Sequence, residues 1–195
     1  MQLKKAIDHI VNLLRENLSE NLTYHSVDHT VGVIDRALEI ARAEGLPESE
    51  LTILLLGAAY HDSGFLETYE NHEEKSCELA RRFLPEFGFD ETQIERVSEI
   101  IMETKIPHNP KTKLAEILCD ADMAYIGGKR YQKISQTLYE ELSHYLKDID
   151  SDIWIEKQIV FLENQQFWTE YARGKYQSNK NLVLKRLKQK LMQAG

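Results

Sequence analysis

The spacing of apolar residues is helical along nearly the whole chain, and this constrains the fold more than any other feature of the sequence. Apolar side chains recur at intervals of three and four residues, which places them on one face of an α-helix. The first such stripe consists of Leu3, Ile7, Ile10, Val11 and Leu14. Because only 9 Gly and 4 Pro interrupt the 195 residues, long helices are expected. The sequence predicts an all-α fold.

Glycine, proline and helix-capping residues divide this pattern into separate helices. The helices expected after the first stripe span residues 26–44, 49–62, 71–84, 90 onward, and 113–125. Asn71 and Asp90 are expected to cap two of them, because Glu74 and Gln93 stand at the capping-box position. From residue 130 the pattern is again helical, but it is rich in large aromatic side chains.

Composition and charge narrow the classes of function. A net charge of −8 disfavours general nucleic-acid binding, because a phosphate backbone attracts surfaces rich in Lys and Arg. The longest apolar run, residues 53–60, is too short to cross a bilayer, and the start of the chain lacks the apolar stretch of a signal peptide. Cys77 and Cys119 stand far apart and are expected to be buried thiols. We therefore expect a cytoplasmic protein without a membrane partner.

A His-Asp pair, His61-Asp62, ends the third predicted helix. His61 continues the apolar stripe of this helix, which also contains Gly57, so that another helix can approach closely. Neighbouring residues on a helix point about 100° apart, so both side chains reach one ion only where the helix is ending. Ser63-Gly64 supplies that ending.

Two further histidines lie at the start of the helix predicted over residues 26–44. His29 leads an apolar stripe that directs its side chain inward, and the stripe continues through Val33, Ala37 and Ile40. His25 sits at or before the helix start, where a side chain is freer to meet a substrate.

Two aspartates compete for an inward position on the helix predicted over residues 113–125. Asp122 falls on the apolar stripe of this helix, one turn after Leu118, whereas Asp120 points away from it. A carboxylate on a core-facing stripe is costly unless it is paired or bound to a metal. Asp122 is therefore the candidate ligand, and Asp120 is interpreted as a solvated or helix-stabilising carboxylate.

This ordered set of residues resembles the HD superfamily of metal-dependent phosphohydrolases over about residues 25–128. In that resemblance His29 matches the first metal ligand, His61 and Asp62 match the central pair, and Asp122 matches the last. The segment YHSVDHT also resembles cyclic-nucleotide phosphodiesterases, in which the earlier histidine is a general acid. This implies catalytic roles for His25, as the acid, and for Asp62, as the group that orients water or bridges two ions.

His72 and His108 lie between the central pair and Asp122, where HD branches with two metals place extra ligands. Those branches often carry a histidine at the end of the preceding helix, where Glu103 and Thr104 stand here. We therefore keep two roles open for His72 and His108. They are ligands of a second ion, or they hold a substrate phosphate as charged donors.

The expected protein is an enzyme with one or two divalent ions per chain. Imidazole and carboxylate ligands suit Mn, Fe, Co, Ni, Zn or Mg. The resemblance implies a small phosphorylated substrate, a nucleotide or another phosphate mono- or diester, hydrolysed by metal-activated water. Two alternatives stay open: a diiron HD-type oxygenase, and a non-enzymatic ligand-binding module in which the metal is a structural staple.

Gly127 and Gly128 make the sharpest break in the chain. We predict an HD-type metal-binding helical domain over residues 1–128. A helical, aromatic-rich C-terminal extension over residues 129–195 is expected to pack on the same domain. Its aromatic residues indicate either core packing or a dimer contact, so a homo-oligomer is one possibility.

Overall fold

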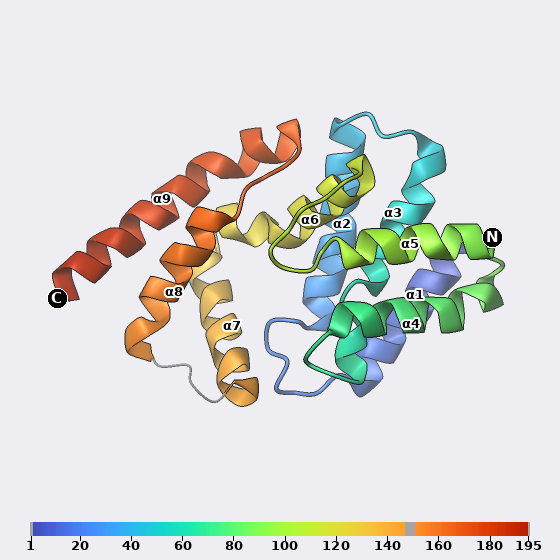
Figure 1. The fold of residues 1–195 in the computed structure, drawn as a ribbon, viewed down its shortest axis with the longest axis horizontal. Coiled ribbons are helices and arrows are strands. Elements are labelled where there is room, and N and C mark those ends of the chain that lie inside the picture. The colour runs from blue at the N-terminus through green and yellow to red at the C-terminus, as the bar shows by residue number, and fades with distance from the viewer. Residues whose placement is uncertain (1, 147–150, 195) are drawn as a thin grey trace.

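The computed structural model describes residues 2–146 and 151–194, and within these residues it contains helices and no strand (Figure 1). The α-helices are α1 (Leu3–Asn17), α2 (Val27–Ala43), α3 (Glu48–Tyr60), α4 (His72–Phe83), α5 (Glu91–Met102), α6 (Lys113–Met123), α7 (Tyr131–Tyr145), α8 (Ser151–Asn164) and α9 (Glu170–Ala194). The 3₁₀ helices are η1 (Ser63–Leu66), η2 (Leu84–Phe87) and η3 (Ala124–Gly127). The all-α prediction is confirmed.

Helix α3 lies at the centre of the first part of the chain. It contacts α1, α2, α5 and α6, and its residues from Ile53 to Tyr60 are almost all buried. A helix that is apolar on every side is stable only inside the protein, which explains this position. The His61-Asp62 pair follows directly after α3 and therefore lies in the interior of the protein.

Gly57 permits the close packing of α3 against α5 and α6. A Cβ atom at this position would lie 2.4 Å from Cδ1 of Ile100 and 3.4 Å from Cδ2 of Leu118. The expected close approach at Gly57 is therefore confirmed, with α5 as the nearer neighbour.

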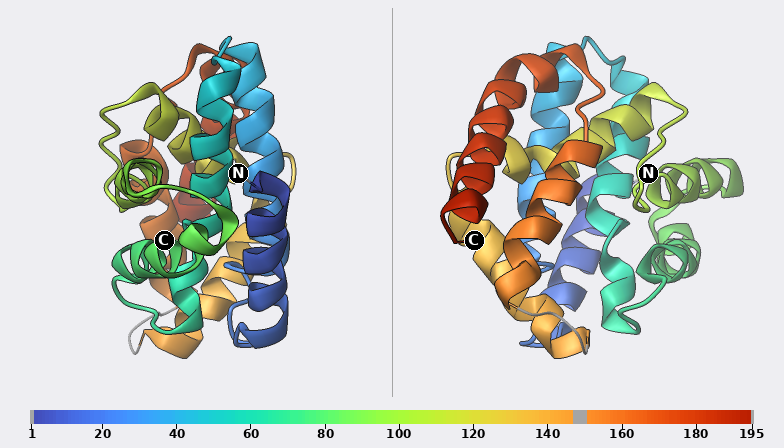
Figure 2. Two further views of the ribbon diagram at one scale, coloured as in Figure 1. Left: turned by 90° about the vertical axis from the view of Figure 1, so that its right-hand side faces the viewer. Right: turned by 60° about the vertical axis from the view of Figure 1, so that its left-hand side comes forward.

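Helices α7, α8 and α9 lie together on one side of the molecule, and α1, α3, α4 and α5 on the other, with α6 between them (Figures 1 and 2). One cluster of buried apolar side chains is built by α1 to α6, and a second by η3 and α7 to α9. Helix α9 crosses η3 so closely that a Cβ atom on Gly127 would lie 2.5 Å from the backbone oxygen of Tyr176. The domain boundary at residue 128 stays a prediction.

Asp120 anchors the start of α9 to α6. Its carboxylate accepts hydrogen bonds from the backbone N–H groups of Trp168 and Thr169, at 2.9 and 2.7 Å, and from the Thr169 hydroxyl at 2.7 Å. Burial raises the pKa of Asp120 to about 6, although these bonds favour the charged form. The interpretation of Asp120 as solvated is wrong, because the side chain is fully buried and ties α6 to the residues just before α9.

The two predicted caps have different outcomes. Asp90 caps α5 in a capping box with Gln93, as expected. Asn71 makes no side-chain cap to α4 and instead adopts a left-handed conformation with φ of 55°. Asparagine tolerates this region better than most residues, so Asn71 turns the chain into α4.

Two smaller expectations also have outcomes. Cys77 and Cys119 are buried free thiols, as predicted. Among the described residues, no helix has both the length and the apolar composition needed to cross a membrane.

We expect Gly57→Ala to destabilise the protein by about 1–3 kcal/mol, because the added methyl group collides with Ile100. Ile100→Val removes the nearest atom, so the double variant should be roughly 1 kcal/mol more stable than the sum of the two single effects predicts. Urea denaturation of the four proteins measures this coupling. Strictly additive effects would show that this contact does not limit the packing of α3.

Candidate metal centre

The end of α3 brings His61 and Asp62 to the same point. Asp62 leaves the helix with φ of −104° and ψ of 6°, and its Oδ2 atom lies 3.1 Å from Nε2 of His61. The Nδ1 atom of His61 donates to the carbonyl of Ala58 at 2.9 Å, which orients the ring and leaves Nε2 for a ligand. The prediction that both side chains converge where the helix ends is confirmed.

The turn after Asp62 is held in place by α4. Ser76 on α4 donates to the carbonyl of His61 at 2.7 Å and accepts from the N–H group of Gly64 at 2.8 Å. A Cβ atom on Gly64 would lie 1.9 Å from the carbonyl oxygen of His72. Glycine at this position therefore allows the start of α4 to lie directly against the turn.

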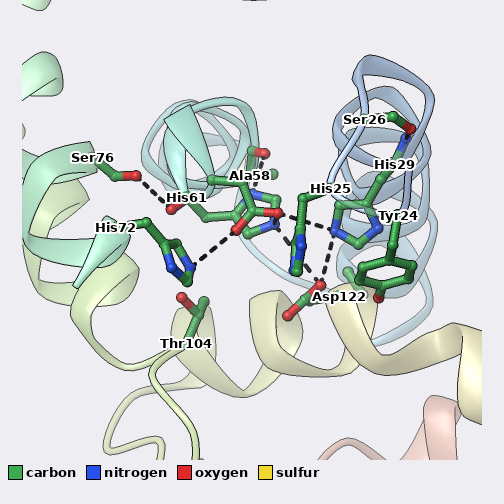
Figure 3. Close-up of polar contacts among 12 residues, drawn as sticks. Tyr24, His25, Ser26, His29, Ala58, His61, His72, Ser76, Thr104 and Asp122 are labelled. Carbon is green, nitrogen blue, oxygen red and sulfur yellow. Dashed lines mark hydrogen bonds and ion pairs between the residues drawn. The ribbon is translucent and has the colours of Figure 1, made fainter. Parts of the chain in front are cut away.

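His29 and Asp122 complete a cluster from two further helices (Figure 3). His29 lies in the first turn of α2, where its backbone N–H is capped by the Ser26 hydroxyl, and Asp122 lies in the last turn of α6. Nε2 of His29 is 3.1 Å from Oδ1 of Asp122 and 3.3 Å from Oδ2 of Asp62. One ligand atom from each of His29, His61 and Asp122 lies within 4.8 Å of the other two.

The unpartnered atoms of this cluster fit a metal ion. Nε2 of His29, Nε2 of His61 and Oδ2 of Asp62 are buried and have no hydrogen-bond partner, although Oδ2 of Asp62 lies 3.3 Å from Nε2 of His29 and 3.1 Å from Nε2 of His61. Ligand atoms about 2.1 Å from an ion and at right angles to each other lie about 3 Å apart. The atoms therefore converge on a common point, as a coordination shell requires.

Charge also concentrates in the cluster. Burial lowers the pKa of His29, but the carboxylates of Asp122 and Asp62 outweigh it and raise that pKa to about 9. Burial likewise opposes ionisation of Asp62, yet the neighbouring His61 and His29 hold its pKa well below the usual range. Two buried carboxylates of this kind need a compensating positive charge.

His25 lies beside the cluster and is held by a residue of the C-terminal part of the chain. Nδ1 of His25 pairs with Oε1 of Glu141 on α7, which is fully buried. The other carboxylate oxygen accepts from the backbone N–H groups of Tyr24 and His25 at 2.8 and 2.9 Å, and the Tyr69 hydroxyl donates to Oε1 at 3.3 Å. Burial raises the pKa of Glu141, but its bond with His25 gives a net lowering.

Sequence reasoning missed Glu141, although a signal was present. Ile134, Leu138 and Tyr145 share one face of α7 with Glu141, because they are spaced by four, three and four residues. The argument that singled out Asp122, a carboxylate on an apolar stripe, applies equally to Glu141.

His72 reaches the cluster from the other side of Asp62. Its Nε2 atom is 3.6 Å from Oδ1 of Asp62 and 3.6 Å from Oε1 of Glu73, which is also buried. The ring of His72 stacks on Phe65 with 3.9 Å between centroids, and the ring of His25 stacks on the same Phe65 at 4.4 Å. His72 is therefore placed to bind a group that also contacts Asp62.

His108 lies in the loop between α5 and α6, and both its ring nitrogens are buried without a hydrogen-bond partner. Burial lowers the pKa of His108, and the charge of Asp122 opposes this only in part. A neutral imidazole is the form that binds a metal, so the electrostatics favour the ligand role over that of a charged phosphate donor.

Comparisons with known proteins agree with this geometry. A model of the HD domain family matches residues 26–123, just over half of the chain. No curated protein sequence matches this chain. The chain is similar to a predicted HD superfamily hydrolase from an uncultured Thermotogales bacterium, whose crystal structure aligns with a TM-score of 0.62 and 25% identity over 96% of this chain and 92% of that one. His25 and Glu141 lie outside the span of the family model.

Replacing Asp122 and Asp120 one at a time separates the roles of these two residues, which lie half a turn apart on α6. Asp122→Ala should remove the bound metal. Asp120→Ala should keep the metal but lower the free energy of unfolding by roughly 2–3 kcal/mol, because the buried donors at the start of α9 lose their acceptor. Metal-to-protein ratios from mass spectrometry and denaturant melts measure both. Metal lost from the Asp120 variant and kept by the Asp122 variant would contradict the assignment.

We further expect two ions per chain at saturating metal, because His72 faces the Asp62 oxygen that does not point at His29 and His61. His72→Ala should then lower the ratio from about two to about one, and His144→Ala, an exposed position on α7, serves as the control. An unchanged metal-to-protein ratio in His72→Ala would contradict the ligand role and indicate that this histidine contacts the substrate instead.

Proposed function

The chain belongs to the HD domain family, and on that premise we propose that it is a metal-dependent phosphohydrolase acting on a phosphate mono- or diester. The observation that carries the proposal is the set of buried, unpartnered ligand atoms on His29, His61 and Asp62, which converge with Asp122. A structural role alone would normally give each of these buried atoms a hydrogen-bond partner.

The donor set favours a divalent ion of the Mn, Fe, Co, Ni, Zn or Mg group, with one or two ions per chain. His29, His61, Asp62 and Asp122 would hold it through nitrogen and oxygen, and His72 and His108 would complete a second position. No thiolate takes part, because Cys77 and Cys119 donate to backbone carbonyls elsewhere. When bound, the ion lowers the pKa of water and polarises a phosphate oxygen.

The chain itself supplies orientation and a proton. In the proposed reaction Asp62 orients the attacking water, since its carboxylate borders both His61 and His72. His25 protonates the leaving oxygen through Nε2, while Glu141 holds the Nδ1–H of the same ring. The backbone N–H groups of Tyr24 and His25 keep Glu141 in position for this role.

The pairing of His25 with Glu141 favours hydrolysis over the two alternatives. Departure of an alkoxide needs a proton donor, whereas a diiron oxygenase and a metal-stapled binding module do not require one at this place. The substrate we propose is a small phosphorylated molecule.

Hydrolysis of a panel of phosphate mono- and diesters by the metal-loaded protein tests the proposal, with released inorganic phosphate measured for the monoesters and released alcohol for the diesters. Oxygen consumption by the protein loaded with reduced iron, without hydrolysis of any ester, would identify the oxygenase instead. If the protein loaded with Mn, Fe, Co, Ni, Zn or Mg catalyses neither reaction, the enzyme proposal is refuted and the non-enzymatic binding module is the remaining alternative.

His25→Ala should lower kcat for a simple alkyl phosphate by about 10²–10⁴-fold, because alkoxide is a poor leaving group without a proton. The loss should be much smaller for 4-nitrophenyl phosphate, whose leaving group needs little help. Glu141→Gln should show the same selective loss, since it keeps the size of the side chain but removes the charge that orients His25.

Steady-state rates on the two esters measure this difference, with metal content checked in each variant and His144→Ala as the control. Equal losses on both esters would show that His25 does not act as the acid.

A further inference from the structure

A cavity of about 380 Å³ adjoins the histidines of the proposed active site. His25 and His72 form part of its wall, and α7 and α8 close it on the opposite side. Its volume falls within the range of about 300–1,000 Å³ that is usual for small-molecule sites. A substrate whose phosphate lies at the metal centre would therefore extend its alcohol part into this cavity.

The wall of the cavity is apolar and aromatic. The side chains that give it this character are Phe65, Met123, Leu138, Leu142, Trp154 and Phe161. Lys157 is the one lining residue with a permanent charge among those the structure describes, and it is exposed. No carboxylate lines the cavity in these described parts of the chain. Glu141, which pairs with Nδ1 of the lining residue His25, is itself fully buried and is not part of the wall.

Several polar groups of the wall are already used within the protein. Tyr131 and Ser135 both donate to Oε1 of Gln158, at 3.0 and 2.6 Å. The Nε2 atom of Gln158 donates to the carbonyl of Trp154 at 3.3 Å, and the Tyr69 hydroxyl is directed to Glu141. Apart from the two histidines, the exposed Lys157 amine and the Tyr24 hydroxyl, which has no hydrogen-bond partner in the described part of the chain, few donors or acceptors remain for the hydroxyl groups of a sugar or the edge of a base.

We propose that the substrate is the phosphate ester of an uncharged, largely apolar or aromatic alcohol, and not a nucleotide. This inference rests on the proposed phosphohydrolase function. Burying a ribose and a base edge in this cavity would remove water from several polar groups without replacing its hydrogen bonds, which is costly. An apolar ring instead gains from burial and from contact with the aromatic wall.

The test uses three monoesters of primary alcohols, so that the chemistry of the leaving group is matched. They are 2-(2-naphthyl)ethyl phosphate, adenosine 5′-monophosphate and glycerol 1-phosphate. We expect kcat/KM for the naphthylethyl ester to exceed both others by at least about 100-fold, the order of binding energy that burial of such a ring supplies. A preference for the nucleotide would overturn the inference and leave the phosphohydrolase intact.

Leu142→Trp narrows the cavity, and the matched control is Leu146→Trp, which changes an exposed leucine outside the lining. The first variant should lower kcat/KM for the naphthylethyl ester at least about tenfold more than for glycerol 1-phosphate, and the control should not. Circular dichroism checks folding, and Leu138→Gln provides a second lining variant if Leu142→Trp does not fold. Equal effects of the lining and control variants would overturn the inference.

A binding measurement gives a readout that does not depend on turnover. Calorimetry should detect 2-(2-naphthyl)ethanol binding to the metal-free protein, weakened at least about tenfold by Leu142→Trp and unchanged by Leu146→Trp. Absence of binding would overturn the inference. Binding that follows this pattern, with no hydrolysis of any ester, would overturn the proposed function while supporting the apolar chemistry of the cavity.

Discussion

Two carboxylates and two imidazoles share one buried point, and the rest of the structure depends on how that charge is compensated. Asp62 and Asp122 are removed from water at a cost that neither the core nor their neighbours offset without a positive charge. Without an ion, the imidazolium of His29 supplies one positive charge, since the neighbouring carboxylates raise the pKa of that histidine to about 9. A divalent ion at the same point would satisfy all the unpartnered atoms at once. The packing around the cluster, from the close approach at Gly57 to the turn at Gly64, holds the groups together in either case.

The C-terminal helices complete this centre and do not merely cover it. Asp122 faces the cluster, while Asp120, half a turn away on α6, holds the start of α9. Glu141 on α7 reaches His25 across 116 positions of sequence. The same helices form the far wall of the cavity beside His25. The part of the chain outside the family match therefore contributes both the group that positions the proposed acid and the surface that would select the substrate.

Local patterns in the sequence were enough to predict the helices and to predict that Asp122, and not Asp120, faces the cluster. Helical periodicity fixes which side chains share a face. Local patterns were also enough for the convergence of His61 and Asp62, since that depends only on where α3 ends. The pairing of Glu141 with His25 and the burial of Asp120 were not predicted, because each depends on which distant segment meets the side chain. Asn71 shows a third limit: the sequence fits the capping-box pattern, yet this residue makes no side-chain cap and adopts a left-handed backbone conformation.

The most direct test of the central claim is anomalous diffraction from a crystal grown with Mn²⁺. The account predicts a peak about 2.0–2.2 Å from Nε2 of His29, Nε2 of His61 and Oδ1 of Asp122, with Asp62 also in contact. A well-ordered, manganese-saturated crystal with no peak within about 3 Å of these atoms would contradict it.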